Sequence, residues 1–364
     1  MSSSYKFVGL SPLDRAYRII KKKNLEALLI TSRENTRYLS GFTGSDSTLL
    51  VTPDKNGLHL FCDSRYTEQA KDESPEWRVI EYKQVVDAVA KSISDLKLMK
   101  IGFESRHISY NLYHRYIEAL DKPVLVPLDR IIDSIRVSKA KSEVSKIKKA
   151  ISIAESAFEE TLSLLKPGVR ENEWALQFEC AMRRAGSEPV PFDVIVASGE
   201  RGAMPHAKAS SKVMKKGELV TVDFGACFEG YNSDSTVTVA LGNPDKELKE
   251  IHLTVLEAHD MAIEAAKAGM ESRQLDAVAR KHIEERGYGK YFGHGLGHGV
   301  GLAVHEEPPV SPLSEDVLEE GAVVTIEPGI YVPGKGGVRI EDMIFIKSDS
   351  AELLTTLPKE LRTL

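Results

Sequence analysis

The sequence predicts an α+β protein of two domains, and three observations support this fold class. The chain has 364 residues, more than one hydrophobic core usually serves. Short apolar runs alternate with amphipathic segments over residues 11–103, which is typical of an α/β domain with a mixed sheet. In the rest of the chain, a pair of helical segments followed by strands occurs twice, which indicates an internal duplication. We place the boundary near residue 132, so the expected domains are residues 1–132 and 133–364.

The first domain is expected to alternate helices with strands. Residues 11–24 place apolar side chains at helical spacing among basic residues, and residues 25–30 form an apolar run typical of a buried strand. The further expected elements are a helix at residues 85–98 and strands at residues 48–52, 58–62, 77–82 and 100–103. The segments at residues 37–45 and 63–66 are expected to be turns.

The second domain is expected to contain two pairs of helices. A long amphipathic stretch covers residues 131–165, and another helix is predicted at residues 172–185 after the break at Pro167 and Gly168. The second pair is predicted at residues 246–268 and 272–285. Strands are expected at residues 191–197, 219–224, 234–239, 323–327 and 337–346.

Composition excludes several classes of protein. A net charge of -6 gives no reason to expect nucleic acid or an anionic membrane as a partner. The three cysteines are scattered without C-x-x-C spacing, so neither a disulfide framework nor a thiolate zinc site is expected. The first residues lack an apolar signal core, and no run reaches the roughly 18 apolar residues of a membrane span. We therefore expect a protein of the reducing cytoplasm.

Residues 219–240 are expected to form a β-hairpin, because two alternating runs flank a turn-rich segment. If the turn is centred on Phe228 and Glu229, Asp223 lies opposite Asp234, with Cβ atoms roughly 5 Å apart. Like charges this close repel unless a proton or a cation lies between them. The pair indicates either a solvated face of the hairpin or part of a cation site.

A glycine-rich segment at residues 293–301 contains His294 and His298. Histidines four residues apart share one face of a helix, as in some zinc enzymes, but glycine at every second position argues against a helix here. An extended segment also presents both imidazoles on one side, because side chains in a strand repeat every two residues. His305 follows a few residues later.

Glu327 and Glu341 each lie at the end of an apolar strand, where burial of an unpaired carboxylate costs free energy. Together with Asp223, Asp234 and His298, they make a thiolate-free set of four carboxylates and one imidazole. Such a set suits manganese, cobalt or zinc, and its charge is sufficient for two ions. Two ions roughly 4 Å apart can hold a bridging hydroxide and polarise a carbonyl group. The residues predict metal-assisted hydrolysis.

Four segments strongly resemble the pita-bread metallopeptidases, the family of aminopeptidase P, prolidase and methionine aminopeptidase. They occur in order between residues 190 and 346, at residues 221–225 with Asp234 following, 293–301, 325–329 and 338–342. The resemblance implies a pseudo-duplicated pita-bread catalytic domain with a curved antiparallel sheet. It also implies a creatinase-like first domain that contributes to substrate access and dimer contacts.

The resemblance assigns the five candidate ligands to two divalent ions. It implies that Asp234 and Glu341 bridge the ions, that Asp223 completes one site, and that His298 and Glu327 complete the other. Glu327 is further implied to be the general acid/base that moves a proton from the water to the leaving amine. Manganese is the expected metal, with cobalt, zinc or iron as alternatives.

Other side chains are expected to surround the scissile bond. His206 and His305 match family histidines that hold the substrate. His294, Tyr331 and Arg339 match positions near the site. The bond before proline has no N–H, and apolar walls such as Phe192 would accept the proline ring without leaving a donor unmatched.

The first domain favours the proline-specific branch, because methionine aminopeptidases usually consist of the catalytic domain alone. Residues 41–45 and 63–66 look more like aminopeptidase P than prolidase. We therefore expect an Xaa-Pro aminopeptidase, acting on peptides with proline at the second position, and a homodimer. The alternative is an Xaa-Pro dipeptidase, or prolidase.

Two other classes of protein are less favoured. A non-catalytic peptide-binding relative would have lost metal ligands, and every ligand position here matches the family. An unrelated dinuclear hydrolase of phosphate or other amide substrates is supported only by the generic ligand set.

Overall fold

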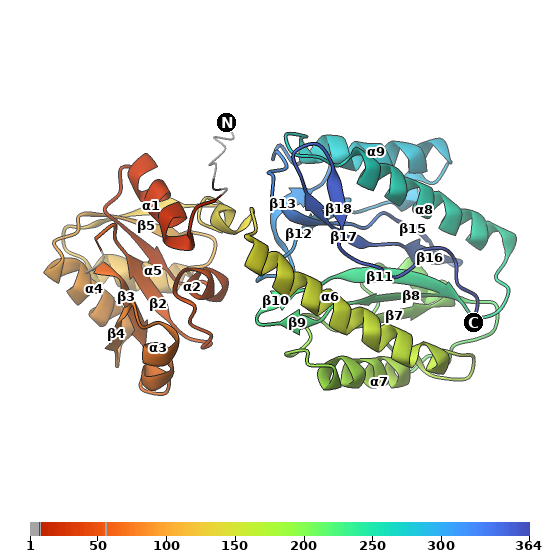
Figure 1. The fold of residues 1–364 in the computed structure, drawn as a ribbon, viewed down its shortest axis with the longest axis horizontal. Helices are drawn as coiled ribbons and strands as arrows, with labels where there is room; N and C mark the ends of the chain where they lie inside the picture. Colours follow the sequence, from red (N-terminus) through yellow and green to blue (C-terminus); the bar gives the residue numbers. More distant parts are fainter. Residues whose placement is uncertain (1–6, 8, 55–56) are drawn as a thin grey trace. The chain divides into compact units, whose positions relative to one another are not determined.

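A computed structural model describes residues 7, 9–54 and 57–364 (Figure 1). The chain divides into two compact units, one that ends at Arg136 and one that comprises Val137–Leu364. The first contains a mixed sheet and the second antiparallel sheets, which confirms the predicted α+β class. None of the helices among the described residues is both long enough and apolar enough to cross a bilayer.

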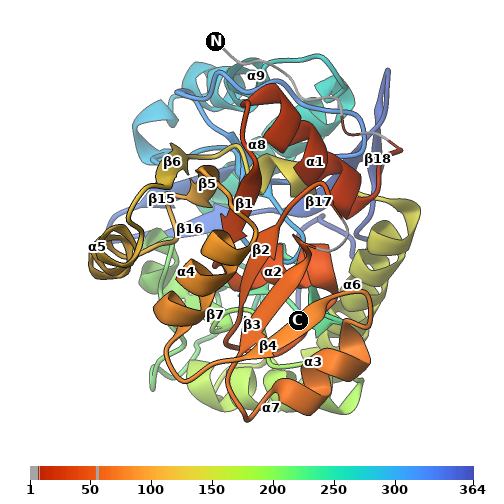
Figure 2. The same ribbon diagram turned by 90° about the vertical axis from the view of Figure 1, so that its left-hand side faces the viewer.

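The N-terminal unit is built on a six-stranded sheet of order β4-β3-β2-β1-β5-β6 (Figure 2). Strand β1 pairs antiparallel with β2 and parallel with β5, so the sheet is mixed as predicted. Helices α4 and α5 pack on one face through a common apolar cluster. The elements are α1 (Pro12–Lys22), β1 (Ala27–Ile30), α2 (Arg33–Ser40), β2 (Thr48–Val51), β3 (His59–Cys62), α3 (Thr67–Glu73), β4 (Arg78–Glu81), α4 (Val85–Asp95), β5 (Lys100–Glu104), α5 (Tyr110–Ala119), β6 (Val124–Leu128) and the 3₁₀ helix η2 (Asp133–Arg136).

Helix α2 corrects the prediction of a turn over residues 37–45, because residues 37–40 are helical. The helix is short and polar, so its apolar spacing is weak, but both ends are well defined. The Ser32 side chain caps the N-terminus by accepting from the Asn35 amide, and Gly41 ends the helix with a left-handed φ of 80°. Helices α3 and α5 and strand β6 were also missing from the prediction.

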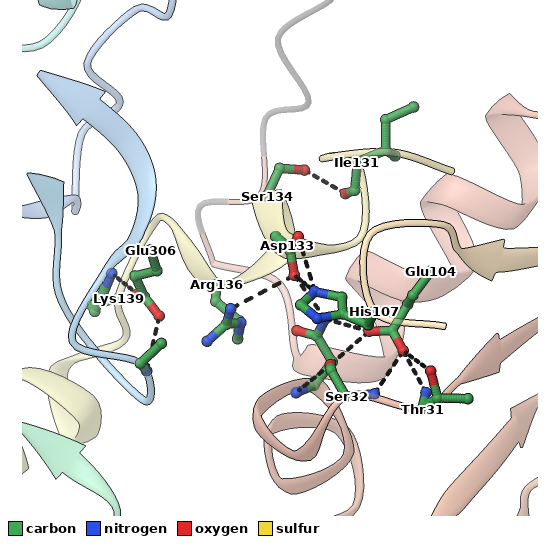
Figure 3. Close-up of polar contacts among 12 residues, drawn as sticks. Thr31, Ser32, Glu104, His107, Ile131, Asp133, Ser134, Arg136, Lys139 and Glu306 are labelled. Atoms are coloured by element: carbon green, nitrogen blue, oxygen red, sulfur yellow. Dashed lines mark hydrogen bonds and ion pairs between the residues drawn. The ribbon is translucent and has the colours of Figure 1, made fainter. Parts of the chain in front are cut away.

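A buried polar network fixes the start of α2 to the end of β5 (Figure 3). Glu104 accepts hydrogen bonds from the Ser32 amide (2.8 Å) and hydroxyl (2.7 Å), and from the Asn35 side chain (2.6 Å). Asn35 also donates to Asp133 (3.0 Å), which lies 3.2 Å from His107 Nε2. Glu104, His107 and Asp133 lie close enough to hold a metal ion. Since donors already occupy both Glu104 oxygens, we interpret the cluster as a structural network.

We expect His107 to make the N-terminal unit less stable as pH rises. The hydrogen bond to Asp133 raises the pKa of His107. The stabilisation of the folded state by protonated His107 is therefore complete below the pKa of the unfolded state, about 6.5. It is lost as pH rises through the higher folded-state pKa. Since the imidazole is 35% exposed, the contribution is at most about 1 kcal/mol. Denaturant unfolding from about pH 6 to pH 8 should show this loss in the unsubstituted chain and not in His107→Gln. His114→Gln, at an exposed position of α5, should follow the unsubstituted chain.

The second unit holds antiparallel strands between two helix pairs, α6/α7 and α8/α9 (Figure 1). Its helices are α6 (Lys141–Thr161), η3 (Leu162–Leu164), α7 (Glu171–Arg184), η4 (Gly199–Ala203), α8 (Lys246–Ala265), α9 (Ser272–Glu285) and η5 (Gly289–Tyr291). Its strands are β7 (Ile195–Ser198), β8 (Leu219–Phe224), β9 (Cys227–Phe228), β10 (Tyr231–Asn232), β11 (Ser235–Ala240), β12 (Gly297–Gly299), β13 (Glu306–Val310), β14 (Val323–Ile326), β15 (Gly329–Val332), β16 (Gly336–Arg339), β17 (Asp342–Ile346) and β18 (Ala351–Leu353).

Each helix pair buries apolar side chains against the strands of the unit. Helices α6 and α7 share a cluster with β8 and β11 in which Phe158 stacks on Phe224, with ring centroids 5.4 Å apart. Helices α8 and α9 share another cluster with β14 and β17. The repeated order of helix pair and strands is the arrangement expected from the sequence.

The apolar run at residues 337–346 is not one strand as predicted. It divides into β16, which pairs with β15, and β17, which pairs with β14. Glu341 lies between them and forms an isolated antiparallel bridge with Thr236 of β11. This break brings a carboxylate from the second half of the unit next to the hairpin of the first half.

Candidate metal centre

The β8–β11 hairpin forms as predicted, but its register differs from the prediction. Asp223 pairs with Thr236 and not with Asp234, which lies just before β11. The turn is centred on Glu229 and Gly230, which have φ values of 46° and 77°, one residue later than expected. A two-residue turn with left-handed backbone at both positions favours glycine at the second.

The corrected register moves the partner of Asp223 by two residues, so each side chain keeps the face predicted for it. Val220, Val222 and Phe224 belong to the apolar cluster beneath α6 and α7. Asp223 and Asp234 both line a cavity of about 530 Å³. The two aspartates therefore share a site although they are not cross-strand partners.

All five predicted ligand side chains line this cavity, and they come from both halves of the unit. Asp223 lies on β8, Asp234 before β11, His298 on β12, Glu327 after β14, and Glu341 between β16 and β17. Asp234, His298 and Glu341 each offer one ligand atom within 4.8 Å of the others. His298 Nε2 also lies 3.4 Å from Glu327 Oε1 and 3.7 Å from Asp234 Oδ2.

Asp223 lies outside this group of three. One carboxylate oxygen accepts a 2.6 Å hydrogen bond from Arg339 Nη2, whereas Oδ1 is buried and has no hydrogen-bond partner among the described residues. A buried carboxylate oxygen without a partner costs free energy, and a cation is the kind of partner that would satisfy it.

The carboxylates repel one another strongly in the metal-free protein. Burial, followed by the charge of Glu341, raises the pKa of both Asp234 and Glu327 well above the usual carboxyl range. Burial, followed by the charge of Asp223, raises the pKa of Glu341 to about 8. Divalent cations would remove this repulsion, so the residues fit a metal centre.

His298 is in the form that binds metals. Burial lowers its pKa to about 4, so the imidazole is neutral. Its Nδ1 lies 3.1 Å from the Gly299 carbonyl oxygen, and donation to that oxygen leaves the Nε2 lone pair facing Glu327 and Asp234. This is the usual way in which a second hydrogen bond orients a histidine ligand.

The glycines around His298 are required by close packing of β12 between its neighbours. A Cβ atom on Gly297 would lie 2.1 Å from the Thr325 carbonyl oxygen, and one on Gly299 would lie 2.2 Å from that of Glu307. Of the segment predicted to be extended, residues 297–299 form a strand, since β12 pairs with β13 and β14, whereas His294 lies before it.

Arg339, Tyr331 and His294 form a chain of hydrogen bonds beside the carboxylates. Arg339 Nη1 donates to the Tyr331 hydroxyl (3.0 Å), which lies 2.9 Å from His294 Nε2. Burial lowers the pKa of His294 to about 4, so this imidazole is neutral and its Nε2 accepts a hydrogen bond from the Tyr331 hydroxyl. Arg339 Nη1 also donates to the Pro205 carbonyl (3.1 Å), next to His206. Arg339 and Tyr331 are buried, and His294 is half-buried.

His206, His305 and Phe192 also line the cavity. The His305 ring lies 4.2 Å from that of His298 between centroids, and burial lowers the pKa of His305. The next residue, Glu306, forms a buried 2.6 Å ion pair with Lys139 (Figure 3). Every predicted site residue therefore lies at the cavity or, for Tyr331, in contact with Arg339 and His294, which border it.

The prediction missed two threonines that hold the ligands. Thr236 Oγ1 donates to Glu341 Oε2 (2.8 Å) and accepts from Arg339 Nε (3.1 Å). Thr325 Oγ1 accepts from the His298 amide (3.1 Å). Strand alternation could have indicated both threonines. Thr325 lies two residues before Glu327 and Thr236 lies two residues after Asp234, so each is expected on the same face as a predicted ligand. The prediction also missed Lys208 and Asp193, which line the cavity and form an exposed ion pair of 2.8 Å. No sequence pattern indicated this pair.

Comparison with known proteins identifies the class to which this fold and cavity belong. Residues 145–348 match metallopeptidase family M24, and residues 12–138 match the creatinase/prolidase N-terminal domain. The chain belongs to metallopeptidase family M24, which implies divalent metal ions, and its second unit has the pita-bread fold.

Particular relatives narrow the class to Xaa-Pro peptidases. The chain is 38% identical over 349 residues to the Xaa-Pro dipeptidase of Pyrococcus furiosus, covering 96% of this chain and 99% of the relative. It is similar to the structure of Xaa-Pro dipeptidase from Bacillus anthracis, with a TM-score of 0.93, 41% identity and coverage of 97% and 99%. It is also similar to the X-Pro aminopeptidase of Thermotoga maritima, with a TM-score of 0.90, 42% identity and coverage of 97% and 99%.

Proposed function

We propose that this chain is an Xaa-Pro dipeptidase, or prolidase, that uses two divalent cations. The observation that carries the proposal is the gathering of four carboxylates and one neutral imidazole around one cavity. Two of the relatives described above are named Xaa-Pro dipeptidase. The sequence alone favoured the Xaa-Pro aminopeptidase, and these names support its alternative better.

Five side chains would hold the cations. In the proposal Asp234 and Glu341 would contribute to both ions, Asp223 would contribute to one, and His298 and Glu327 would contribute to the other. Manganese is the proposed metal, because an oxygen-rich set with one imidazole suits it. When bound, the two cations supply Lewis acidity that activates a water molecule and polarises the scissile carbonyl.

Glu327 would move the proton during hydrolysis. Its Oε1 lies 3.4 Å from His298 Nε2, at the cavity. A carboxylate oxygen takes a proton from the attacking water, whose oxygen becomes part of the new carboxyl group. The same carboxyl group then delivers the proton to the proline nitrogen as the C–N bond breaks.

The remaining side chains would bind and orient the substrate. His206 and His305 hold the groups around the scissile bond, and the Phe192 ring forms an apolar wall for proline. The cavity, about 530 Å³, is within the usual range for small-molecule sites. The homodimer and the cytoplasmic location expected from the sequence stay predictions.

Xaa-Pro aminopeptidase is the second candidate, supported by the name of the Thermotoga maritima relative. The two activities differ in whether the site accepts a residue after proline. We therefore propose a test with metal-free full-length protein, reconstituted with Mn²⁺ and supplied with Ala-Pro, Ala-Pro-Ala or Ala-Ala-Ala. A prolidase cleaves Ala-Pro and leaves both tripeptides largely intact.

Faster cleavage of Ala-Pro-Ala than of Ala-Pro would instead identify an aminopeptidase. Equal cleavage of Ala-Ala-Ala and Ala-Pro-Ala would contradict proline selectivity in either form. Activity that survives complete metal removal would contradict the metal-dependent mechanism.

A further inference from the structure

Lys359 is a buried lysine that no ligand motif includes, and its ammonium lies against the metal centre. It belongs to the segment at residues 355–364, and only 8% of the residue is exposed. Its Nζ donates to the Glu341 carbonyl oxygen (2.6 Å) and to Ser235 Oγ (3.0 Å), and it lies 3.0 Å from Asp342 Oδ1. A buried ammonium requires such partners, because desolvation of an unpaired charge is costly.

These contacts join the two backbone segments that carry Asp234 and Glu341. Ser235 follows Asp234 directly, and its hydroxyl also donates to the Glu341 carbonyl (3.2 Å). The Glu341 amide donates to the Thr236 carbonyl (3.1 Å), and Lys359 Nζ lies 3.4 Å from the same carbonyl. One ammonium therefore contacts both peptide groups of the bridge between β11 and the β16–β17 break.

The surrounding chain holds Lys359 in this position. Glu155 of α6 accepts a hydrogen bond from the Leu357 amide (3.2 Å). Residues 362–364 pair with the end of β11, because the Leu364 amide donates to the Ala240 carbonyl (2.8 Å). Asp342, the ionic partner of Lys359, also lies 3.1 Å from His259 Nε2. The ammonium is fixed from several sides, as a positioning group must be.

We propose that Lys359 is a positioning residue for the metal centre, because it sets the distance between the carboxylates of Asp234 and Glu341. This inference rests on the proposed function, in which both carboxylates are shared by two cations. A shared ligand pair would be sensitive to small displacements, since each carboxylate would have to serve two ions at once. Lys359 touches neither substrate nor cation in this scheme and acts through the backbone of its neighbours.

The test is a calorimetric titration of the metal-free full chain with Mn²⁺ alone, which measures Mn²⁺ affinity. Lys359→Met keeps the apolar stem and removes the donors. We expect Mn²⁺ affinity to fall by about 10- to 100-fold, the range typical for outer-shell partners of metal ligands. Lys359→Gln, which keeps one N–H donor, should bind with intermediate affinity and covers the case in which the methionine variant does not fold.

Lys212→Met is the matched control. Lys212 is a half-buried lysine of the same unit, and its ammonium donates to Ser198 Oγ (2.7 Å) and Glu218 (2.8 Å). Its loss should lower the thermal stability of the metal-free protein and leave Mn²⁺ affinity unchanged.

Mn²⁺ affinity of Lys359→Met equal to that of the unsubstituted protein would overturn the inference. An equal loss of affinity in Lys212→Met would also overturn it, since the effect would then be general destabilisation. If the unsubstituted protein bound no Mn²⁺, the proposed function itself would fail, and that result is distinct from the other two.

Discussion

Replacement of Glu327 by glutamine is expected to lower kcat for Xaa-Pro hydrolysis by about 10²- to 10⁴-fold, the usual contribution of a general acid/base. The amide oxygen can still face a cation, but the side chain can no longer accept a proton from water. We therefore expect kcat to fall by a much larger factor than the factor by which KM changes. Steady-state kinetics with Ala-Pro at saturating Mn²⁺ measure both constants.

Glu320→Gln is the control for this substitution, since Glu320 is exposed in the same unit. It should retain the kinetics of the unsubstituted protein. A Glu327→Gln variant that retained kcat within a few fold would assign the proton transfer to another group, with His305 next to His298 as the first candidate.

Replacement of Asp234 by asparagine is expected to have opposite effects on metal binding and on stability. Mn²⁺ affinity should fall by more than the roughly 100-fold that marks the upper range for outer-shell partners, because a shared ligand is lost. The metal-free variant should nevertheless be more stable than the unsubstituted metal-free protein near neutral pH. Burial and then the charge of Glu341 raise the pKa of Asp234, so its ionisation destabilises the folded state.

The direction of the pH dependence follows from the raised pKa. The unsubstituted metal-free protein loses stability as pH rises from the unfolded carboxyl value, about 4, through the higher folded-state value, because the folded state holds its proton longer. Asparagine removes this loss. Thermal unfolding of both metal-free proteins across this range, together with Mn²⁺ calorimetry, measures the two effects. Asp349→Asn, at an exposed position, should change neither.

Such opposite effects are common where a site is built for binding and not for stability. Unchanged Mn²⁺ affinity in Asp234→Asn would contradict the assignment of Asp234 as a ligand. Lower stability of the metal-free variant would contradict the destabilising effect of its buried charge.

The spacing of apolar residues along the sequence predicted most helices and strands of the second unit, because this spacing is regular there. The α9 helix has the predicted bounds, and β8 and β11 were correctly paired. The hairpin register was wrong because Gly230, not Glu229, occupies the second left-handed position of the turn. The α2 helix was missed because caps at Ser32 and Gly41 define it more strongly than apolar spacing does.

The candidate site was predicted largely through family resemblance, because ligand types and short motifs lie in order along the chain. The contacts between halves were beyond such reasoning. The break at Glu341 and its bridge to Thr236 depend on which strands each segment meets. Lys359 lies in an irregular segment without motif or periodicity, and only the folded chain brings its ammonium to Glu341.

Crystals grown with Mn²⁺ and measured for anomalous scattering offer the most direct test of the proposed centre. If five side chains share two cations, two peaks should appear about 4 Å apart, within bonding distance of the carboxylates of Asp223, Asp234, Glu327 and Glu341 and of His298 Nε2. A cavity without peaks in saturating Mn²⁺, or peaks confined to Glu104, His107 and Asp133, would contradict a dinuclear centre at these residues.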